Sequence, residues 1–293
     1  MDALGRSVSQ VSGAMDITSL LYAVASDRAG RGASFVSRPT AWEEALALCW
    51  DAKDVLIVTG FFIPSMDACE TDGPLGSVVL GRALASLGKR VVLMGDERDI
   101  TVLRAVSEAV GGPGVVAGDG ALPQGPELVI FIERPGRAED GTYRDMRGAD
   151  ISSEVVPLDG MAQQALDRGI PVLGIGDGGN EAGMGPLREL LARGLPDYAA
   201  CLSCVPATVA LAADVSNWGA YALAALLSVR HGEWLGLSPG EEERMLRAAV
   251  AAGAVDGAAR RKGLSVDGFP LPLLVQVGEQ IEAWYRRTRE RDA

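Results

Sequence analysis

The sequence predicts an α/β fold: a mainly parallel sheet with helices on both faces, followed by a helical C-terminal third. Short apolar runs near residues 55, 90, 128 and 171 are typical of buried strands, and stretches with helical apolar spacing separate them. This alternation favours parallel strands joined by helical crossovers. In open sheets of this type ligands bind beyond the carboxyl ends of the strands, so a site is expected there.

The first strand is expected over residues 54–60, which are β-branched, apolar and closed by glycine. Helices are expected before it, over 17–25 and 41–49. The elements expected after it are a helix over 77–87, a strand over 89–95, a helix over 100–110, a strand over 127–133, a helix over 158–168, a strand over 171–175 and a helix over 181–193. The last third is expected to be helical over 207–213, 217–229, 239–252 and 272–289.

The stretch 171–185, PVLGIGDGGNEAGMG, is the strongest candidate for a binding loop. Six glycines fall within twelve residues, with Asp177, Asn180 and Glu181 among them. Glycine loses the most backbone entropy on folding, so such density indicates a sharp turn or a close approach to a ligand. The alternative is a turn that only joins a strand to a helix.

Gly174, Gly176 and Gly179 match the spacing of the G-x-G-x-x-G dinucleotide fingerprint. That fingerprint belongs in the first strand-turn-helix of its domain, whereas this match lies beyond the middle of the chain. Asp177 would also place a negative charge where the phosphates should lie. Binding of a nicotinamide or flavin dinucleotide is therefore disfavoured.

The composition excludes several classes of protein. A net charge of −12 argues against nucleic-acid binding, because no basic stripe is present to neutralise phosphates. No apolar run reaches the length of a membrane span, and no secretory signal pattern opens the chain, so a cytoplasmic protein is expected. A small anionic substrate would need a cation at its site.

Cysteine and histidine chemistry is weakly supported. Cys201 and Cys204 have the spacing of a redox motif, but their apolar, alanine-rich surroundings favour buried small hydrophobic residues. Four cysteines and a single histidine, His231, leave little basis for a zinc site or a Ser-His-Asp triad.

Acidic residues follow three of the expected strands. The pairs Glu70 and Asp72, Glu133 and Arg134, and Asp177 and Glu181 lie in loops that leave the same edge of the sheet. We therefore expect these loops to converge. Asp72 has an alternative role, because the Thr-Asp-Gly-Pro segment that contains it is also typical of a cap on the following helix.

Several of these segments together resemble the D-glutamate cyclase family. The similarity is carried, in chain order, by residues 70–74, 174–185, 215–223 and 253–257, with further likeness at 60–62 and 133–136. It extends over about residues 30–270. The resemblance implies one α/β domain (residues 1–293) that acts as a hydro-lyase, converting D-glutamate to 5-oxo-D-proline with loss of water.

Cyclisation requires the amine of glutamate to attack its own side-chain carboxylate, so the site must fold the substrate back, remove protons and polarise the departing oxygen. Clustered carboxylates are the ligands that Mn²⁺, Mg²⁺ or Ca²⁺ prefer. The expected metal ligands are Glu70, Asp72, Asp177 and Glu181. We expect Asp177 or Glu181 to act as the general base. The expected substrate-binding residues are Arg134, Gly178, Gly179, Asn180 and Asn217.

Two rival functions remain open at this point. The same carboxylates would suit a metal-dependent hydrolase or phosphotransferase that acts on a small anionic metabolite, or a small-molecule sensor without chemistry. The sequence also leaves the native metal, the preference for D- over L-glutamate and the oligomeric state undecided, with a homo-oligomer among the options.

Overall fold

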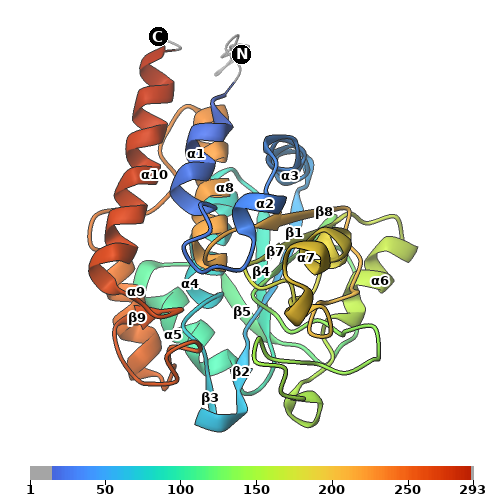
Figure 1. Cartoon of the computed structure of the whole chain (residues 1–293). Helices are drawn as coiled ribbons and strands as arrows, with labels where there is room; N and C mark the ends of the chain where they lie inside the picture. The colour runs from blue at the N-terminus through green and yellow to red at the C-terminus, as the bar shows by residue number, and fades with distance from the viewer. Residues whose placement is uncertain (1–14, 292–293) are drawn as a thin grey trace.

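The computed structural model describes residues 15–291 and confirms the α/β fold. Six parallel strands form one sheet in the order β5-β4-β1-β6-β7-β8 (Figure 1). Their bounds are β1 Asp54–Thr59, β4 Arg90–Gly95, β5 Gly114–Ala117, β6 Leu128–Ile132, β7 Val172–Gly176 and β8 Val209–Ala212. The central strands β6 and β7 are buried throughout, as expected for a sheet covered on both faces.

The direction in which the chain adds strands reverses between β1 and β6. From β1 the chain moves outward to β4 and β5, and it then returns to β6 and continues through β7 to β8 on the other side. In doubly wound sheets such a reversal opens a crevice at the carboxyl ends of the two strands concerned. The loops that follow β1 and β6 therefore border the place where a ligand is expected.

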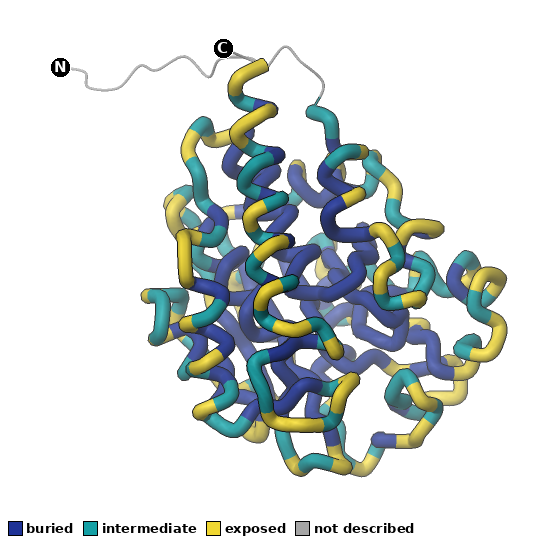
Figure 2. Tube along the Cα trace, turned by 60° about the vertical axis from the view of Figure 1, so that its left-hand side comes forward, coloured by how far each residue is buried: buried dark blue, intermediate teal, exposed yellow. Residues whose placement is uncertain are grey.

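Helices cover the two faces of the sheet unequally. On one face Ile57, Ile130 and Leu173 belong to a large core shared with many helices, whereas Leu56, Val58 and Phe131 point into a smaller core on the other face. The helices of the large core are α1 Ile17–Val24, α3 Pro39–Asp51, α4 Pro74–Ser86, α5 Ile100–Val110, α8 Ser216–His231, α9 Glu241–Ala251 and α10 Leu271–Arg291. Figure 2 shows the buried positions gathered in the interior, while the outer helices alternate between buried and exposed.

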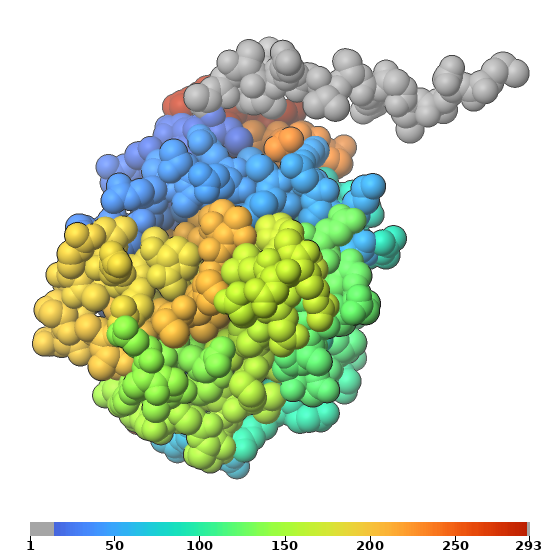
Figure 3. Space-filling view, turned by 90° about the vertical axis from the view of Figure 1, so that its right-hand side faces the viewer, coloured from blue at the N-terminus to red at the C-terminus, as the bar shows by residue number. Residues whose placement is uncertain are grey.

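The opposite face carries α6 Gly160–Asp167 and α7 Arg188–Gly194, with the short α2 Ala33–Val36 beside α7. Figure 3 shows this side of the molecule, with α7 in yellow and α6 in yellow-green. Within the described residues, no helix combines the length and apolar character needed to cross a bilayer.

Two short hairpins extend from this framework toward the crevice. The first pairs β2 Phe62–Ile63 with β3 Ala68–Cys69 and leads directly to Glu70. The second pairs β9 Ser265–Val266 with β10 Phe269–Pro270. Its two turn residues are Asp267 and Gly268, with φ of +55° and +80°, which is typical of a type I′ Asp-Gly turn.

The structure corrects three elements of the sequence prediction. Residues 207–213 were expected to be helical, but 209–212 form β8, because pairing with β7 overrides the helix propensity of an alanine-rich segment. Strand β5 lies within residues 111–126, for which the sequence predicted neither a helix nor a strand. The helix expected over 181–193 begins only at Arg188, after the single turn η3 Gly185–Leu187.

Candidate functional site

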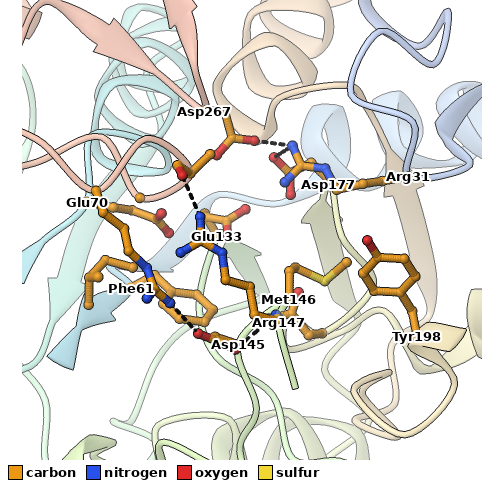
Figure 4. A pocket seen from close by; sticks show the side chains of 15 residues that line it. Arg31, Phe61, Glu70, Glu133, Asp145, Met146, Arg147, Asp177, Tyr198 and Asp267 are labelled. Atoms are coloured by element: carbon orange, nitrogen blue, oxygen red, sulfur yellow. Dashed lines mark hydrogen bonds and ion pairs between the residues drawn. The ribbon is translucent and has the colours of Figure 1, made fainter. Parts of the chain in front are cut away.

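A pocket of about 220 Å³ lies at the carboxyl ends of β1, β6 and β7. Charged side chains dominate its lining, as Figure 4 shows. The acidic ones are Glu70, Glu133, Asp145, Asp177 and Asp267, and the basic ones are Arg31, Arg147 and Arg260. The three loops expected to converge do converge, and segments near residues 31, 145, 260 and 267 complete the pocket.

Glu70 follows the β2–β3 hairpin and is held in place through its backbone. Its N–H donates to the Phe61 carbonyl at 2.9 Å, and the next N–H, of Thr71, donates to the Val255 carbonyl at 2.8 Å. The carboxylate is buried, and its Oε1 has no hydrogen-bond partner among the described residues. Burial, with Glu133, Asp267 and Asp72 nearby, raises the pKa of Glu70 well above its usual range. An unpaired buried carboxylate is costly unless a proton or a cation neutralises it.

Asp72 caps a helix, but not the one that follows it. Its carboxylate accepts the N–H groups of Ser216 at 2.9 Å and Asn217 at 2.8 Å, which begin α8, and also that of Gly73. Burial and the charge of Asp267 raise the pKa of Asp72 to about 7, although these N–H bonds oppose the shift. The expected alternative, a cap on α4, is thus replaced by a cap on a helix more than 140 residues away.

Asn217 performs the reciprocal task for α4. Its Oδ1 accepts the N–H groups of Gly73 at 3.0 Å and Gly76 at 2.6 Å, and its Nδ2 donates to the Thr71 carbonyl at 3.1 Å. Asn217 does not line the pocket. Its amide is already used by backbone groups, so the expected contact with substrate does not fit this structure.

Glu133 directly follows β6 and lies in the left-handed region, with φ of +45°. Its carboxylate accepts the Ser216 hydroxyl at 2.6 Å, which ties it to the same helix end as Asp72. Burial, followed by the charges of Glu181, Asp72 and Asp267, raises the pKa of Glu133 well above its usual value. The sequence analysis placed Glu133 in a converging loop but assigned it no role.

Within the glycine loop, Glu181 has a structural role. Its side chain is fully buried and accepts the N–H groups of Asp177 at 3.0 Å, Gly178 at 2.7 Å and Gly179 at 2.7 Å. Glu181 does not line the pocket, so the prediction of a metal ligand or base at this position does not fit. The N–H groups of Gly178 and Gly179 are likewise unavailable to a substrate. Because the chain's own carboxylate takes up these amides, a dinucleotide phosphate could not bind them.

The loop folds back onto its own strand, which explains two of its glycines. A Cβ on Gly174 would lie 2.5 Å from the Gly183 carbonyl oxygen, and Gly183 itself has φ of +85°. Only glycine permits this approach of β7 to the returning chain. As a result, Asp177 and Asn180 line the pocket, while Glu181 is buried and faces inward. The Asn180 amide also donates to the Arg144 carbonyl at 3.0 Å.

Arg31, which the sequence analysis missed, lies between α1 and α2 and reaches the acidic residues. Its Nη2 contacts Asp177 at 2.8 Å and also Asp267, and it donates to the Asp214 carbonyl at 3.1 Å. Burial works against its charge, but Asp177 and Asp267 outweigh burial and hold the pKa of Arg31 well above its usual value. Arg31 thus links the glycine loop to the β9–β10 turn.

Arg134 lies in the interior, away from the pocket. It is 1% exposed, with Nη1 donating to Asp99 at 2.9 Å and Nη2 donating to Asp96 at 3.0 Å and to the Val156 carbonyl at 2.6 Å. These bonds commit both terminal nitrogens to the protein. The prediction that Arg134 pairs with a substrate carboxylate does not fit this arrangement, in which Arg134 holds the loops around β1 and β6.

A divalent cation fits part of the acidic cluster. One carboxylate oxygen from each of Asp72, Glu133 and Asp177 lies within 4.8 Å of the others. Oxygen ligands at about 2.0–2.6 Å from Mg²⁺ or Ca²⁺ are compatible with such a separation. Of the expected ligands, Asp72 and Asp177 belong to this group, Glu70 lies on the wall of the pocket, and Glu133 replaces Glu181.

The four cysteines are free, and only Cys204 is exposed. Cys49, Cys69 and Cys201 are buried, as expected for small hydrophobic residues, and the exposed Cys204 departs from that prediction. His231 ends α8, outside the pocket.

A doubly wound α/β domain with a small acidic pocket at its switch point has the architecture of an enzyme or receptor for a small polar metabolite. Residues 20–281 match the family model described as "D-glutamate cyclase-like, C-terminal". The chain is 32% identical over 320 aligned positions to human "D-glutamate cyclase, mitochondrial", with 92% of this chain and 52% of that protein covered. The chain therefore belongs to the D-glutamate cyclase-like family, and it spans about half the length of this curated relative.

Proposed function

We propose that this protein is a hydro-lyase that converts D-glutamate to 5-oxo-D-proline and water with the help of a divalent cation. The observation that supports this most directly is the acidic pocket. Within the described chain Oε1 of Glu70 has no hydrogen-bond partner, and near it lies the group formed by Asp72, Glu133 and Asp177. Family membership supports the substrate, since the human relative is named for it. The pocket of about 220 Å³ favours a small metabolite over a larger ligand.

In this proposal Asp72, Glu133 and Asp177 hold the cation, which can be Mn²⁺, Mg²⁺ or Ca²⁺. When bound, such a cation supplies a Lewis acid that polarises the side-chain carboxylate of the substrate. Arg31 pairs with both Asp177 and Asp267 and so keeps the glycine loop beside the β9–β10 turn. We assign Asn180, which lines the pocket, to hydrogen bonding with the substrate.

We assign proton transfer to Glu70, because its carboxylate lines the pocket and accepts no hydrogen bond from the described residues. In the reaction a C–N bond forms and a C–O bond breaks. The ammonium nitrogen gives up two protons, and both leave with the departing oxygen as water. A carboxylate that first accepts and then donates a proton can serve both steps. Of the two bases expected from the sequence, Asp177 is paired with Arg31 and Glu181 is bonded to backbone N–H groups.

The test is to incubate the purified protein with D-glutamate or L-glutamate, in EDTA or with added Mn²⁺ or Mg²⁺, and to measure 5-oxoproline by chiral chromatography. We expect product from D-glutamate only when a divalent cation is present. Phosphate release from a phosphoester panel without 5-oxoproline would favour the hydrolase. Glutamate binding without any product would favour the sensor.

Asp177→Asn should abolish turnover while the protein remains folded, because Arg31 keeps Asp267 as a partner. The matched control is Asp167→Asn on the exposed end of α6, which should have wild-type activity. Full activity of Asp177→Asn would remove Asp177 from the mechanism.

A further inference from the structure

The basic residues of the pocket differ in whether an acidic side chain already forms an ion pair with them. Arg31 is bound by Asp177 and Asp267, and Arg260 donates to Asp145 at 2.9 Å. Arg147 donates to the Ala258 carbonyl at 2.8 Å, and no ion pair joins it to a carboxylate of the described residues. Arg147 therefore brings a positive charge to the pocket that no acidic partner in the described chain offsets.

The backbone presents Arg147 in a fixed position. Residues 145–148 form a tight turn, in which the Gly148 N–H donates to the Asp145 carbonyl at 2.9 Å and Gly148 has φ of +82°. The Asp145 carboxylate accepts the N–H of Arg147 itself at 2.9 Å, as is typical of an Asx turn. Figure 4 shows the Arg147 side chain extending from this turn across the pocket.

The far side of the pocket fixes the carbonyl that Arg147 contacts. Asp256 accepts the Ala259 N–H at 2.7 Å and the Gly268 N–H at 2.9 Å, which holds the loop around Ala258 against the β9–β10 turn. Gly257 lies against the Glu70 carboxylate, where a Cβ would overlap Oε2. Arg147 thus spans two loops that are each held by their own hydrogen bonds, and it lines the same pocket as Glu70.

We propose that Arg147 binds the α-carboxylate of the substrate and so selects amino acids that carry two carboxylates; this inference rests on the proposed function. The substrate's side-chain carboxylate is consumed at Glu70 and the acidic group, whereas its α-carboxylate stays charged throughout. In a pocket with five acidic side chains that second carboxylate needs a cation. A guanidinium can hold it through two parallel N–H bonds.

The test compares D-glutamate with D-isoglutamine, in which the α-carboxylate is an amide and the reacting groups are unchanged. Loss of a hydrogen-bonded charged contact should lower kcat/KM roughly 10- to 100-fold. We expect that loss for the wild type on D-isoglutamine and for Arg147→Gln on D-glutamate. For Arg147→Gln acting on D-isoglutamine, kcat/KM should fall by no more than it does for either change alone. The control is Arg144→Gln in the same loop, since Arg144 pairs with Asp140 and does not line the pocket.

Calorimetry with glutarate in the presence of Mn²⁺ provides a readout without turnover, because glutarate carries two carboxylates and no amine. Arg147→Gln should weaken glutarate binding by a similar factor, and Arg144→Gln should not. Equal kcat/KM values for Arg147→Gln and wild type on D-glutamate would overturn the inference while leaving the proposed function intact. If the wild type makes no 5-oxoproline, the proposed function fails, and weaker glutarate binding by Arg147→Gln would still support Arg147 as the carboxylate site.

Discussion

Replacing Glu181 by Gln distinguishes a structural carboxylate from a catalytic one, because the two roles predict different effects on stability. The Glu181 carboxylate accepts three backbone N–H groups at 3.0, 2.7 and 2.7 Å in a fully buried position. A glutamine has the same size, but its NH₂ group must face at least one of these N–H donors. With hydrogen bonds to charged groups worth about 1.5–3 kcal/mol each, losing one and weakening two should cost roughly 3–5 kcal/mol.

A carboxylate kept only for catalysis would behave differently. The charge of Glu181 is among the causes that raise the pKa of Glu133, so removing that charge relieves repulsion inside the cluster. If Glu181 made no structural contribution, Glu181→Gln would therefore leave the free energy of unfolding unchanged or increase it. The sign of the change separates the two roles.

Urea unfolding followed by circular dichroism measures this difference in free energy, and hydrogen exchange of residues 177–181 locates it. Glu189→Gln, which alters an exposed glutamate eight residues further along, is the matched control and should leave stability within about 0.5 kcal/mol. A Glu181→Gln protein that unfolds at the wild-type urea concentration and shows no turnover would refute the structural role and restore Glu181 as a base.

Two further predictions concern the other buried charges. Arg134→Met should lower the free energy of unfolding by about 3–5 kcal/mol, because Asp96 and Asp99 lose their buried partner; near-wild-type stability in urea with a raised KM would instead return Arg134 to the substrate site. In EDTA, stability should fall as the pH rises from about 4 to about 7, because burial raises the pKa of Asp72 from its usual value near 4 to about 7, so in this range the folded state holds a proton that the unfolded chain has released. A shift of about three pKa units corresponds to a loss of at most about 4 kcal/mol in the free energy of unfolding. Urea unfolding as a function of pH measures this loss, which should be smaller with Mn²⁺ or in Asp72→Asn. A free energy of unfolding that rises with pH would contradict the assignment.

The strands of the sheet could be predicted where an apolar run in the sequence is long enough to indicate a buried strand. Strands β1 and β6 contain short, nearly continuous apolar runs rich in β-branched residues, and such runs are typical of buried strands. Strand β8 could not be recognised, because its alanine-rich sequence favours a helix until β7 provides a pairing partner. The edge strand β5 has the apolar sequence GVVA, but it is only four residues long and lies in a stretch rich in glycine and proline, so it could not be told from a loop.

The candidate site was predictable to the extent that it follows from the ends of strands. Asp177 and Glu70 could be placed together because their loops leave neighbouring parts of one sheet edge. Arg31 and Asp267 come from a loop before the first strand and a hairpin near the end of the chain, outside that pattern. The side-chain directions of Glu133 and Glu181 depend on backbone angles that sequence spacing does not reveal.

The fold stabilises the carboxylates gathered in and beneath the acidic group of Asp72, Glu133 and Asp177, whereas it leaves Glu70 without a partner among the described residues. Asp72 accepts N–H groups at the start of α8, where the helix dipole favours a negative charge, and Glu133 accepts the Ser216 hydroxyl from the same helix end. Arg31 offsets Asp177 and Asp267. Glu70 receives no such contact from the described residues, and its buried Oε1 remains unpaired. The stability of this region should therefore depend on what enters the pocket, so a cation that binds there would raise the free energy of unfolding and prepare the site for chemistry in the same step.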